Sequence, residues 1–325
     1  MADEKITQLA TATSLVDSDL FVVVTGVGST PATKGIASSN VSVEKIRESG
    51  GTTLTVGAVS DGQYLTRSGS SLIGAALTAG LPSGHLYRLT LSNNGTDANN
   101  DIDIAAGECR DGTDAVDIEI ASAITKRLDA AWAVGTNQGG LDTGTKANST
   151  WYHLWAIKRS DTGVTDVLFS TSATAPTMPT NYDYKRRLGA VKTDGSGNIL
   201  PFTQYKRMFL WKTPVQDVSA TNPGTSAVSR TLSTPLGVKT VAMVSSAVSP
   251  TAAATLVYLS SLDQTDVAVS NSAFTFGTSS TTIGAYGGYQ QIRTDTSSQI
   301  RTRASASGAS TNLYVVTHGY LDDDE

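Results

Sequence analysis

Acidic and amide side chains at alternate positions form the chain's best candidate for a metal site. Asp97, Asn99, Asp101 and Glu108 occupy positions that match 1, 3, 5 and 12 of an EF-hand calcium loop. Position 6 of such a loop requires glycine, but this chain has Ile102 there and no helical pattern flanks the segment. The opposing interpretation is a turn rich in Asn and Asp that leads into a strand. We favour the turn, and we expect no metal ion and no cofactor.

Residues suited to hydrolysis are present, but they are not arranged as a nucleophile with its base. The chain contains no Gly-x-Ser-x-Gly motif, and Ser196 lies between two glycines in a predicted hairpin turn. The acidic pairs Asp101/Asp103 and Asp117/Glu119 have the i, i+2 spacing of the outer face of a half-buried strand. We therefore expect that the protein is not an enzyme.

The aromatic side chains are concentrated in one segment, because all four tryptophans lie between Trp132 and Trp211. Such a concentration is typical of a well-packed core or of a flat binding platform. In the predicted strand at 151–157, alternation places Trp151, His153 and Trp155 on one face, where they form a candidate glycan platform. Burial is the more common fate of paired tryptophans, so packing is the competing interpretation.

The composition predicts an all-β protein. Hydrophobic residues make up 39% of the 325 residues and charged residues only 16%, and Ser, Thr, Val and Gly-bounded short runs are frequent. The net charge is -5 and no basic stripe carries interleaved aromatics, so we expect no nucleic-acid partner. The short basic run Lys185-Arg186-Arg187 is more typical of a solvated or inter-chain salt-bridging face than of a ligand site.

The sequence shows no targeting signal, and it has no cysteine pair or metal-ligand pattern that would cross-link the fold. The N-terminus has no basic and apolar signal-peptide pattern, and the longest apolar run, Leu20 to Val24, is too short to span a bilayer. Cys109 is the only cysteine, which excludes an intrachain disulfide, and the three histidines show no metal-ligand spacing. We expect synthesis in a bacterial cytoplasm, no secretion by a signal peptide and no membrane insertion.

Patterning divides the chain into four parts. Residues 1–47 form a small N-terminal segment that needs a partner for stability, and residues 48–82 form a Gly/Ser-rich extended neck, the alternative being a flexible linker. Residues 83–212 form an aromatic-rich domain resembling a β-sandwich, with one helix predicted at 124–134. Short strands at regular spacing in 213–325 predict a second β-sandwich or a jelly roll.

Two terminal features resemble proteins of tailed bacteriophages or prophages. The pattern Lys-Ile-x-x-Leu-x-x-Ala/Thr, a further Leu, then Asp-x-Phe/Leu and a Val-Val run is similar to the segment that anchors phage tail and fibre proteins to the virion. The resemblance implies virion docking by the apolar residues of this pattern, which are Ile6, Leu9, Leu15, Leu20, Phe21 and Val23. The segment Asp61-Gly62-Gln63-Tyr64-Leu65 resembles segments that recur in phage fibre stalks.

The central segment carries the strongest resemblance. A Trp-Tyr-x-x-Trp strand from Trp151 is followed by Phe-Ser-Thr-Ser-Ala-Thr-Ala-Pro-Thr-Met-Pro, Tyr-x-Tyr-Lys-Arg-Arg-Leu-Gly and Asp-Gly-Ser-Gly-Asn-Ile. This succession is similar to a domain found in the tail-fibre and virion structural proteins of phages. The resemblance implies a homotrimeric tail fibre located in the virion, which docks to other tail proteins by its N-terminus. It also implies that the distal domain, 213–325, contacts a host-surface glycan or protein.

Two other functions stay open at this point. The chain is also compatible with a head-fibre, collar or connector decoration protein that binds no receptor. An enzymatic tail spike that degrades a host glycan is a third interpretation, although no β-helix period is evident in the sequence.

Overall fold

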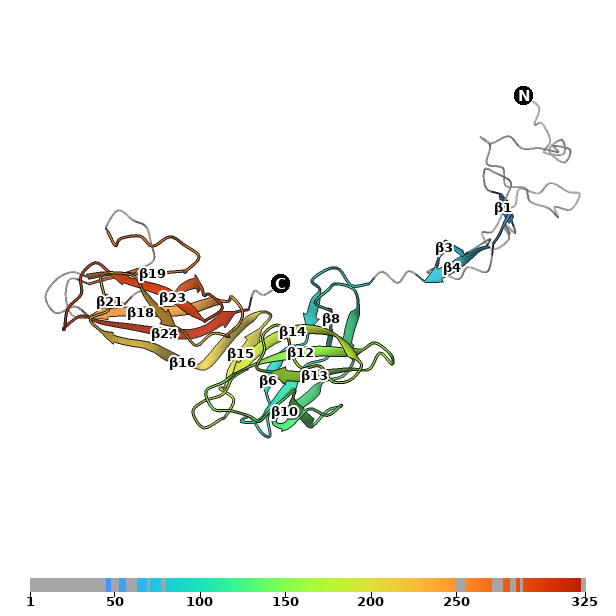
Figure 1. Ribbon diagram of the computed structural model, residues 1–325, viewed down its shortest axis with the longest axis horizontal. Coiled ribbons are helices and arrows are strands. Elements are labelled where there is room, and N and C mark those ends of the chain that lie inside the picture. Colours follow the sequence, from blue (N-terminus) through green and yellow to red (C-terminus); the bar gives the residue numbers. More distant parts are fainter. Residues whose placement is uncertain are drawn as a thin grey trace, which may run out of the picture. The chain divides into compact units, whose positions relative to one another are not determined.

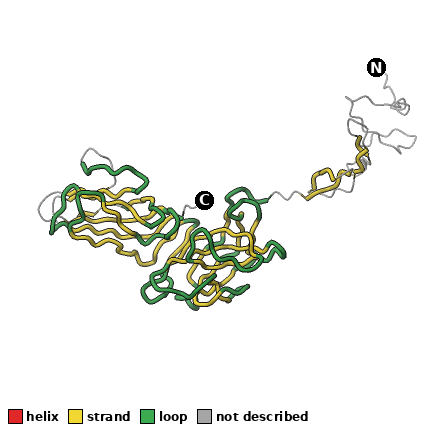
Figure 2. The backbone as a smooth tube through the Cα atoms, viewed as in Figure 1, coloured by secondary structure: helices red, strands yellow, loops and turns green. Residues whose placement is uncertain are grey.

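The structure is a computed structural model of the chain. It describes residues 80–249, 255–270 and 289–322, and the backbone of six further strands that are named below. In this described part every regular element is a β-strand and no helix is present (Figure 2). The all-β class predicted from the composition is therefore confirmed.

The chain divides into two compact units, Met1–Ala79 and Gly80–Glu325. In the first unit the structure describes one four-stranded sheet with the order β1-β2-β4-β3. Its members are β1 (Lys45–Arg47), β2 (Thr53–Val56), β3 (Gln63–Ser68) and β4 (Ser71–Ala76). Strands β2 and β4 run parallel, whereas the β1/β2 and β3/β4 pairs are antiparallel. Three of these strands lie within the segment predicted to be an extended neck.

The second unit begins with a seven-stranded sheet in the order β14-β12-β13-β11-β10-β7-β6. The strands are β6 (Leu91–Asn93), β7 (Asp101–Ile104), β10 (Ile124–Ala131), β11 (Gln138–Leu141), β12 (Trp151–Arg159), β13 (Thr165–Ser170) and β14 (Tyr182–Lys192). A three-stranded sheet, β5-β8-β9, accompanies it. It consists of β5 (Leu86–Arg88), β8 (Gly107–Arg110) and β9 (Asp117–Ile120). The two sheets contribute to one apolar core, which includes the predicted inward residues Ile102, Ile104, Ile118 and Ile120.

The helix predicted at 124–134 is wrong. Residues Ile124–Ala131 form strand β10, which pairs with β7 in antiparallel and with β11 in parallel orientation. Lys126 and Leu128 are fully buried on the inward face of this strand. Alternate burial is the period of a strand, and the packing of both neighbouring strands overrides any local helical preference.

Two further sheets form the C-terminal part of the second unit (Figure 1). One has the order β15-β16-β24-β18-β21, with β22 also paired to β18, and the other has the order β17-β23-β19-β20. The first consists of β15 (Phe202–Tyr205), β16 (Met208–Thr221), β18 (Val241–Ser249), β21 (Ala285–Tyr286), β22 (Gln290–Arg293) and β24 (Asn312–Leu321). The second consists of β17 (Val228–Thr231), β19 (Thr255–Ser260), β20 (Gly277–Ser280) and β23 (Gln299–Ala304). Buried side chains from both sheets form one common core.

Four aromatic side chains join the central and C-terminal sheets, and we call them the aromatic joint: Trp151, Phe209, Trp211 and Tyr320. Tyr320 of β24 is fully buried and stacks on Phe209 of β16 with ring centroids 4.9 Å apart. Its ring also meets Trp151 of β12 edge-on at 5.9 Å, and Trp211 lies 5.8 Å from Trp151. The Tyr320 hydroxyl donates a 2.6 Å hydrogen bond to the carbonyl of Ala190 in β14. The sheets are thus connected by packed aromatic rings and a buried hydrogen bond.

Candidate functional site

The predicted aromatic platform lies inside the protein. Trp151, His153 and Trp155 are only 5%, 0% and 6% exposed, because β12 is paired on both edges and covered on both faces along this stretch. A sugar ring stacks on an exposed aromatic face, so these three side chains do not provide one. The competing interpretation, packing in the core, is confirmed for both tryptophans.

His153 is a buried neutral side chain. Burial, followed by the positive charge of Arg187, lowers its pKa to about 3, and a backbone group of Leu236 only partly opposes this shift. An imidazole with such a low pKa stays uncharged at neutral pH and is a poor general acid there.

The residues of the predicted calcium loop do not come together. Asp97 lies in a turn, where both of its carboxylate oxygens accept hydrogen bonds from the Asn100 side chain. Asp101 belongs to β7 of the seven-stranded sheet, whereas Glu108 belongs to β8 of the three-stranded sheet. Asn99 precedes β7 in the same turn as Asp97. Among the residues that the structure describes, no group of three or more His, Cys, Asp or Glu side chains is placed to hold a metal ion.

The predicted virion-docking residues, which are Ile6, Leu9, Leu15, Leu20, Phe21 and Val23, lie outside the described residues.

One serine–histidine pair resembles part of a hydrolytic site. The Ser245 hydroxyl and Nε2 of His318 are 2.9 Å apart on the neighbouring strands β18 and β24. A catalytic histidine needs a third group that orients its other ring nitrogen, usually a carboxylate. No described residue forms a hydrogen bond with that nitrogen, and the ring instead lies beside Tyr289 at 5.6 Å. The pair therefore lacks the orienting partner of a triad.

The strongest concentration of charge in the second unit is a cleft of about 470 Å³, which we call the basic cleft. Five cationic and three acidic side chains line it, which leaves an excess of two positive charges. The cations come from two places, the run Lys185-Arg186-Arg187 in β14 and the turn Lys206-Arg207 between β15 and β16. The acidic side chains are Asp111, Asp183 and Asp322.

The position of β14 at the edge of its sheet explains why consecutive cations share one cleft. Successive side chains of a regular strand point to opposite faces, so a run of three cannot line a single face. The β12/β14 register shifts so that Leu154 faces Gly189 and Trp155 faces Arg187, which leaves Leu188 as an extra residue. The shift comes after the run, so Lys185, Arg186 and Arg187 keep regular register with β12, and the cleft receives side chains from both faces of this edge strand. On the open edge, the Lys185 carbonyl accepts a 2.8 Å hydrogen bond from the Gly112 amide, which attaches the turn that closes the cleft.

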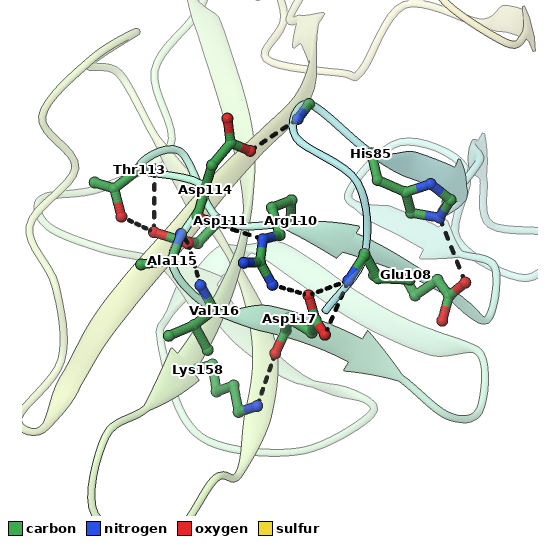
Figure 3. A network of polar contacts seen from close by, with 12 residues as sticks. His85, Glu108, Arg110, Asp111, Thr113, Asp114, Ala115, Val116, Asp117 and Lys158 are labelled. Atoms are coloured by element: carbon green, nitrogen blue, oxygen red, sulfur yellow. Dashed lines mark hydrogen bonds and ion pairs between the residues drawn. The ribbon is translucent and has the colours of Figure 1, made fainter. Parts of the chain in front are cut away.

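That turn, residues 111–116, is held by its own first side chain (Figure 3). Asp111 accepts hydrogen bonds from the Thr113 hydroxyl and from the Thr113, Ala115 and Val116 amides. Burial alone would raise the pKa of the Asp111 carboxyl, but these hydrogen bonds outweigh it and the pKa lies below its usual value. Asp111 is therefore ionised at neutral pH, and its oxygens are used within the turn.

A second network fixes the β8/β9 hairpin below the turn (Figure 3). Arg110 donates to the Asp117 carboxylate, which also accepts a 3.1 Å hydrogen bond from the Leu81 amide. The Lys158 ammonium donates to the Asp117 carbonyl at 2.7 Å. The hydrogen bond from Arg110 is the main reason that the pKa of Asp117 is lowered. On the other side of the hairpin, Nε2 of His85 lies 3.4 Å from a carboxylate oxygen of Glu108.

Arg187 is the cation of the cleft that has the clearest partner. Its two terminal nitrogens donate to the two carboxylate oxygens of Asp322 at 2.7 and 2.5 Å, and the two side chains are 7% and 8% exposed. This fork-to-fork geometry is the strongest form of ion pair between protein side chains. It connects β14 to the end of β24, next to the aromatic joint.

Arg186 differs from its neighbour. Its residue is 9% exposed and it lines the cleft. Within the described part of the chain, no hydrogen bond or ion pair joins its guanidinium to another residue, whereas the Lys185 ammonium lies 5.9 Å above the Trp155 ring. Arg186 is therefore a largely buried cation that lines the cleft and has no partner for its guanidinium among the described residues.

Comparison with known proteins gives no name for this arrangement. No protein-family model matches the chain, and no curated protein matches it. In the described part of the chain no helix is long and apolar enough to cross a membrane.

The basic cleft can bind and orient an anion, because its donors converge and its charge is positive. The sequence contains a partial signal for it, since Lys185-Arg186-Arg187 and Lys206-Arg207 are two short basic runs in a chain with few charges. Sequence reasoning assigned the first run to a solvated or inter-chain face and did not use the second.

Proposed function

We propose that this protein is a structural and adhesive component of a tailed-phage virion, a homotrimeric tail fibre rather than an enzyme. Its N-terminal segment attaches to other tail proteins, and its β-domains project toward the host surface. Weak contacts of the distal domains are multiplied by the presence of several copies. The proposal begins from the resemblance of the 151–199 segment to tail-fibre domains.

The aromatic joint is the observation that carries the proposal. Domains that need only be tethered are usually joined by polar, flexible linkers and move relative to one another. Here Trp151, Phe209, Trp211 and Tyr320 form a buried contact between the central and C-terminal sheets. Strand β16 contributes side chains both to this core and, through Val218, to the C-terminal core. A fibre needs such a connection, since a contact at its distal part holds the particle only if the domains between do not fold over.

We also propose that the protein has no catalytic activity. In the described residues, Ser245 and His318 lack the third member of a triad. In the basic cleft, the Asp322 carboxylate is paired with Arg187, and the Asp111 carboxylate accepts hydrogen bonds from its own turn. A reducing-sugar assay on host polysaccharide tests this part, because release of sugar ends would make the protein a glycan-degrading spike.

The test of the fibre assignment has two measurements on the full chain. Light scattering after size-exclusion chromatography should give the mass of three 33.8 kDa chains. Antibodies against residues 213–325 should then label the tails of purified particles in electron micrographs. A monomeric mass or absence from the particles would overturn the proposal, and label on the head would assign the chain to a head fibre or decoration protein.

A further inference from the structure

Arg186 presents a physical problem that the chain's described residues do not solve. A guanidinium that is largely covered by protein usually has a hydrogen-bonded partner, because little water remains around it. Arg186 is 9% exposed and lines the cleft, yet no other residue that the structure describes forms a hydrogen bond or ion pair with its guanidinium. Its neighbour Arg187 has a bidentate carboxylate partner at the same depth. An unpartnered buried cation that faces a cleft indicates that the missing partner is a ligand.

The turn between β15 and β16 provides a second, independent indication. Tyr205 pairs with Met208, so Lys206 and Arg207 are the two central residues of a tight hairpin. Lys206 has a φ of 55°, in the left-handed region where Gly or Asn is strongly favoured in such turns. A lysine kept in this conformation is strained, and strained residues concentrate at functional sites. Here the strained residue is a cation at the rim of the basic cleft.

The other residues that line the cleft indicate which further chemical groups a ligand would have. Leu86 and Leu188 supply apolar surface, and Thr113, Thr174 and Asp183 supply groups that bind hydroxyls. A volume of about 470 Å³ lies within the range of small-molecule sites. A ligand that fits has one anionic group, several hydroxyls and a compact body. A nucleic-acid backbone fits less well, because its recognition requires an extended basic surface on a chain whose net charge is -5.

We propose that the basic cleft binds an acidic sugar, with the sugar's carboxylate or phosphate held by Arg186 and supported by Lys185 and Lys206. The guanidinium gives a planar donor pair that matches either anion, and the two ammonium groups add positive charge at the rim. This site is additional to the fibre role, and it concerns ligand binding by the folded chain whether or not the chain belongs to a virion.

The chain carries its own competing anions. The sequence continues after Asp322, which already occupies Arg187, with Asp323, Asp324 and Glu325. Because these three carboxylates directly follow a cleft-lining residue in the sequence, they can compete with an outside anion. The experiment therefore includes the variant D323N/D324N/E325Q, which removes these charges and keeps the side-chain sizes.

The test is isothermal titration calorimetry of the full chain at low salt with glucuronate and with glucose 6-phosphate, which separate a carboxylate from a phosphate ligand. Glucose is the neutral control, and inorganic phosphate tests whether the sugar contributes. The variants are R186Q and the matched control R293Q, which removes an exposed arginine whose only described ion pair, to Asp263, is 3.9 Å long. Thermal melts confirm that each variant is folded.

We expect wild type to bind at least one acidic sugar and not glucose. R186Q should weaken that binding by about tenfold or more, the usual effect of losing a charged hydrogen-bond partner. R293Q should leave it within about twofold of wild type, since an exposed distant charge contributes little. The variant D323N/D324N/E325Q should bind as tightly as wild type or more tightly.

Four results would overturn the proposal. The first is no binding of either acidic sugar by wild type, and the second is equal affinity in wild type and R186Q. The third is inorganic phosphate bound as tightly as glucose 6-phosphate, which would remove the sugar from the assignment. The fourth is binding only after the change D323N/D324N/E325Q, which would assign the cleft to the chain's own acidic residues.

Discussion

The buried ion pair between Lys126 and Asp166 makes a stability prediction that depends on pH. Both side chains are 0% exposed, and the Lys126 ammonium lies 3.3 Å from the Asp166 carboxylate. Unit charges at 3.3 Å attract by about 5 kcal/mol at an effective dielectric constant of about 20. The ammonium also donates to the Ala133 carbonyl at 2.7 Å, and the carboxylate accepts from the Gly135 amide at 2.9 Å. Neither side chain is accessible to solvent, so water cannot replace a lost partner.

We expect Lys126→Met to lower the free energy of unfolding by about 3–5 kcal/mol at pH 7, because it leaves a buried carboxylate unpaired. Burial raises the pKa of Asp166, and the positive charge of Lys126 is the main opposing effect. In the variant that opposing charge is gone, so the folded-state pKa rises further above the unfolded value near 3.9. An acid with a raised folded-state pKa stabilises the fold at low pH and loses this stabilisation as pH rises. The deficit of the variant relative to wild type should therefore grow between the folded-state pKa of Asp166 in wild type and its higher pKa in the variant, by at most about 1.4 kcal/mol per pH unit.

The assay is urea denaturation between pH 4 and 8, followed by tryptophan fluorescence, which Trp132 reports locally because Lys126 lies 5.4 Å above its ring. The double variant Lys126→Met with Asp166→Asn removes both charges but keeps an acceptor for the Gly135 amide. It should recover about 2 kcal/mol or more relative to Lys126→Met alone and show no growing deficit. Lys212→Met, at an exposed position, is the control for loss of a lysine. A pH-independent deficit in Lys126→Met, or a double variant as unstable as the single one, would refute the reasoning.

Three further predictions concern buried groups in the second unit. Tyr320→Phe removes the 2.6 Å hydrogen bond to a buried carbonyl of β14 and should cost about 1–2 kcal/mol in urea denaturation, so unchanged stability would contradict the described contact. Cys109 is fully buried and burial raises its pKa to about 12, so a thiol reagent at pH 8 should label it only in denaturant, and fast labelling of native protein would contradict this. Gly139→Ala should lower the free energy of unfolding by about 3 kcal/mol or more, because the new Cβ would lie 1.9 Å from the Ala131 carbonyl oxygen. The control is Gly95→Ala, where no atom lies within 4 Å of the new Cβ, and this variant should melt like wild type.

Strands with regular alternation were predictable, and the strand with a buried lysine was not. The Asp-Ile-Asp-Ile and Asp-Ile-Glu-Ile segments show the period of 2 directly, and their isoleucines are buried as expected. In β10 the inward positions include Lys126 and Leu128, so a polar residue interrupts the apolar alternation. Only the partner Asp166, 40 residues away, makes a lysine acceptable at this position. That pairing is a property of the fold and has no local signal.

The division into domains at 212/213 also illustrates what local patterns miss. The predicted central domain ended at residue 212, but β16 continues from Met208 to Thr221 across this boundary and includes Pro214. The strand pairs with β24 on both sides of that point, with register shifts that absorb the irregularity. Proline is tolerated at such an interruption because no ladder hydrogen bond is required of it.

The basic cleft depends entirely on contacts that are distant in sequence. The 185–187 run, the 206–207 turn and the 111–113 turn are separate stretches, and each has an ordinary explanation when it is taken alone. Their convergence requires the place of β14 at the edge of its sheet and the hydrogen bond from Gly112 to Lys185, which follow from the tertiary fold. The predicted platform failed for a different reason. Trp151 and Trp155 do alternate along β12 as expected, but both faces of this strand are covered, so the two side chains are buried.

The place of β24 in its sheet has a consequence for the order of folding. This strand, Asn312–Leu321, lies between β16 and β18, which are made much earlier during synthesis, and it supplies Tyr320 to the aromatic joint. Until residue 321 has left the ribosome, two strand edges face each other without their middle strand, and one face of the aromatic core is open. A translation product that stops short of β24 therefore exposes unpaired edges and apolar rings, the features by which cellular proteases and chaperones recognise incomplete proteins. Only chains that are translated through β24 can therefore complete both apolar cores.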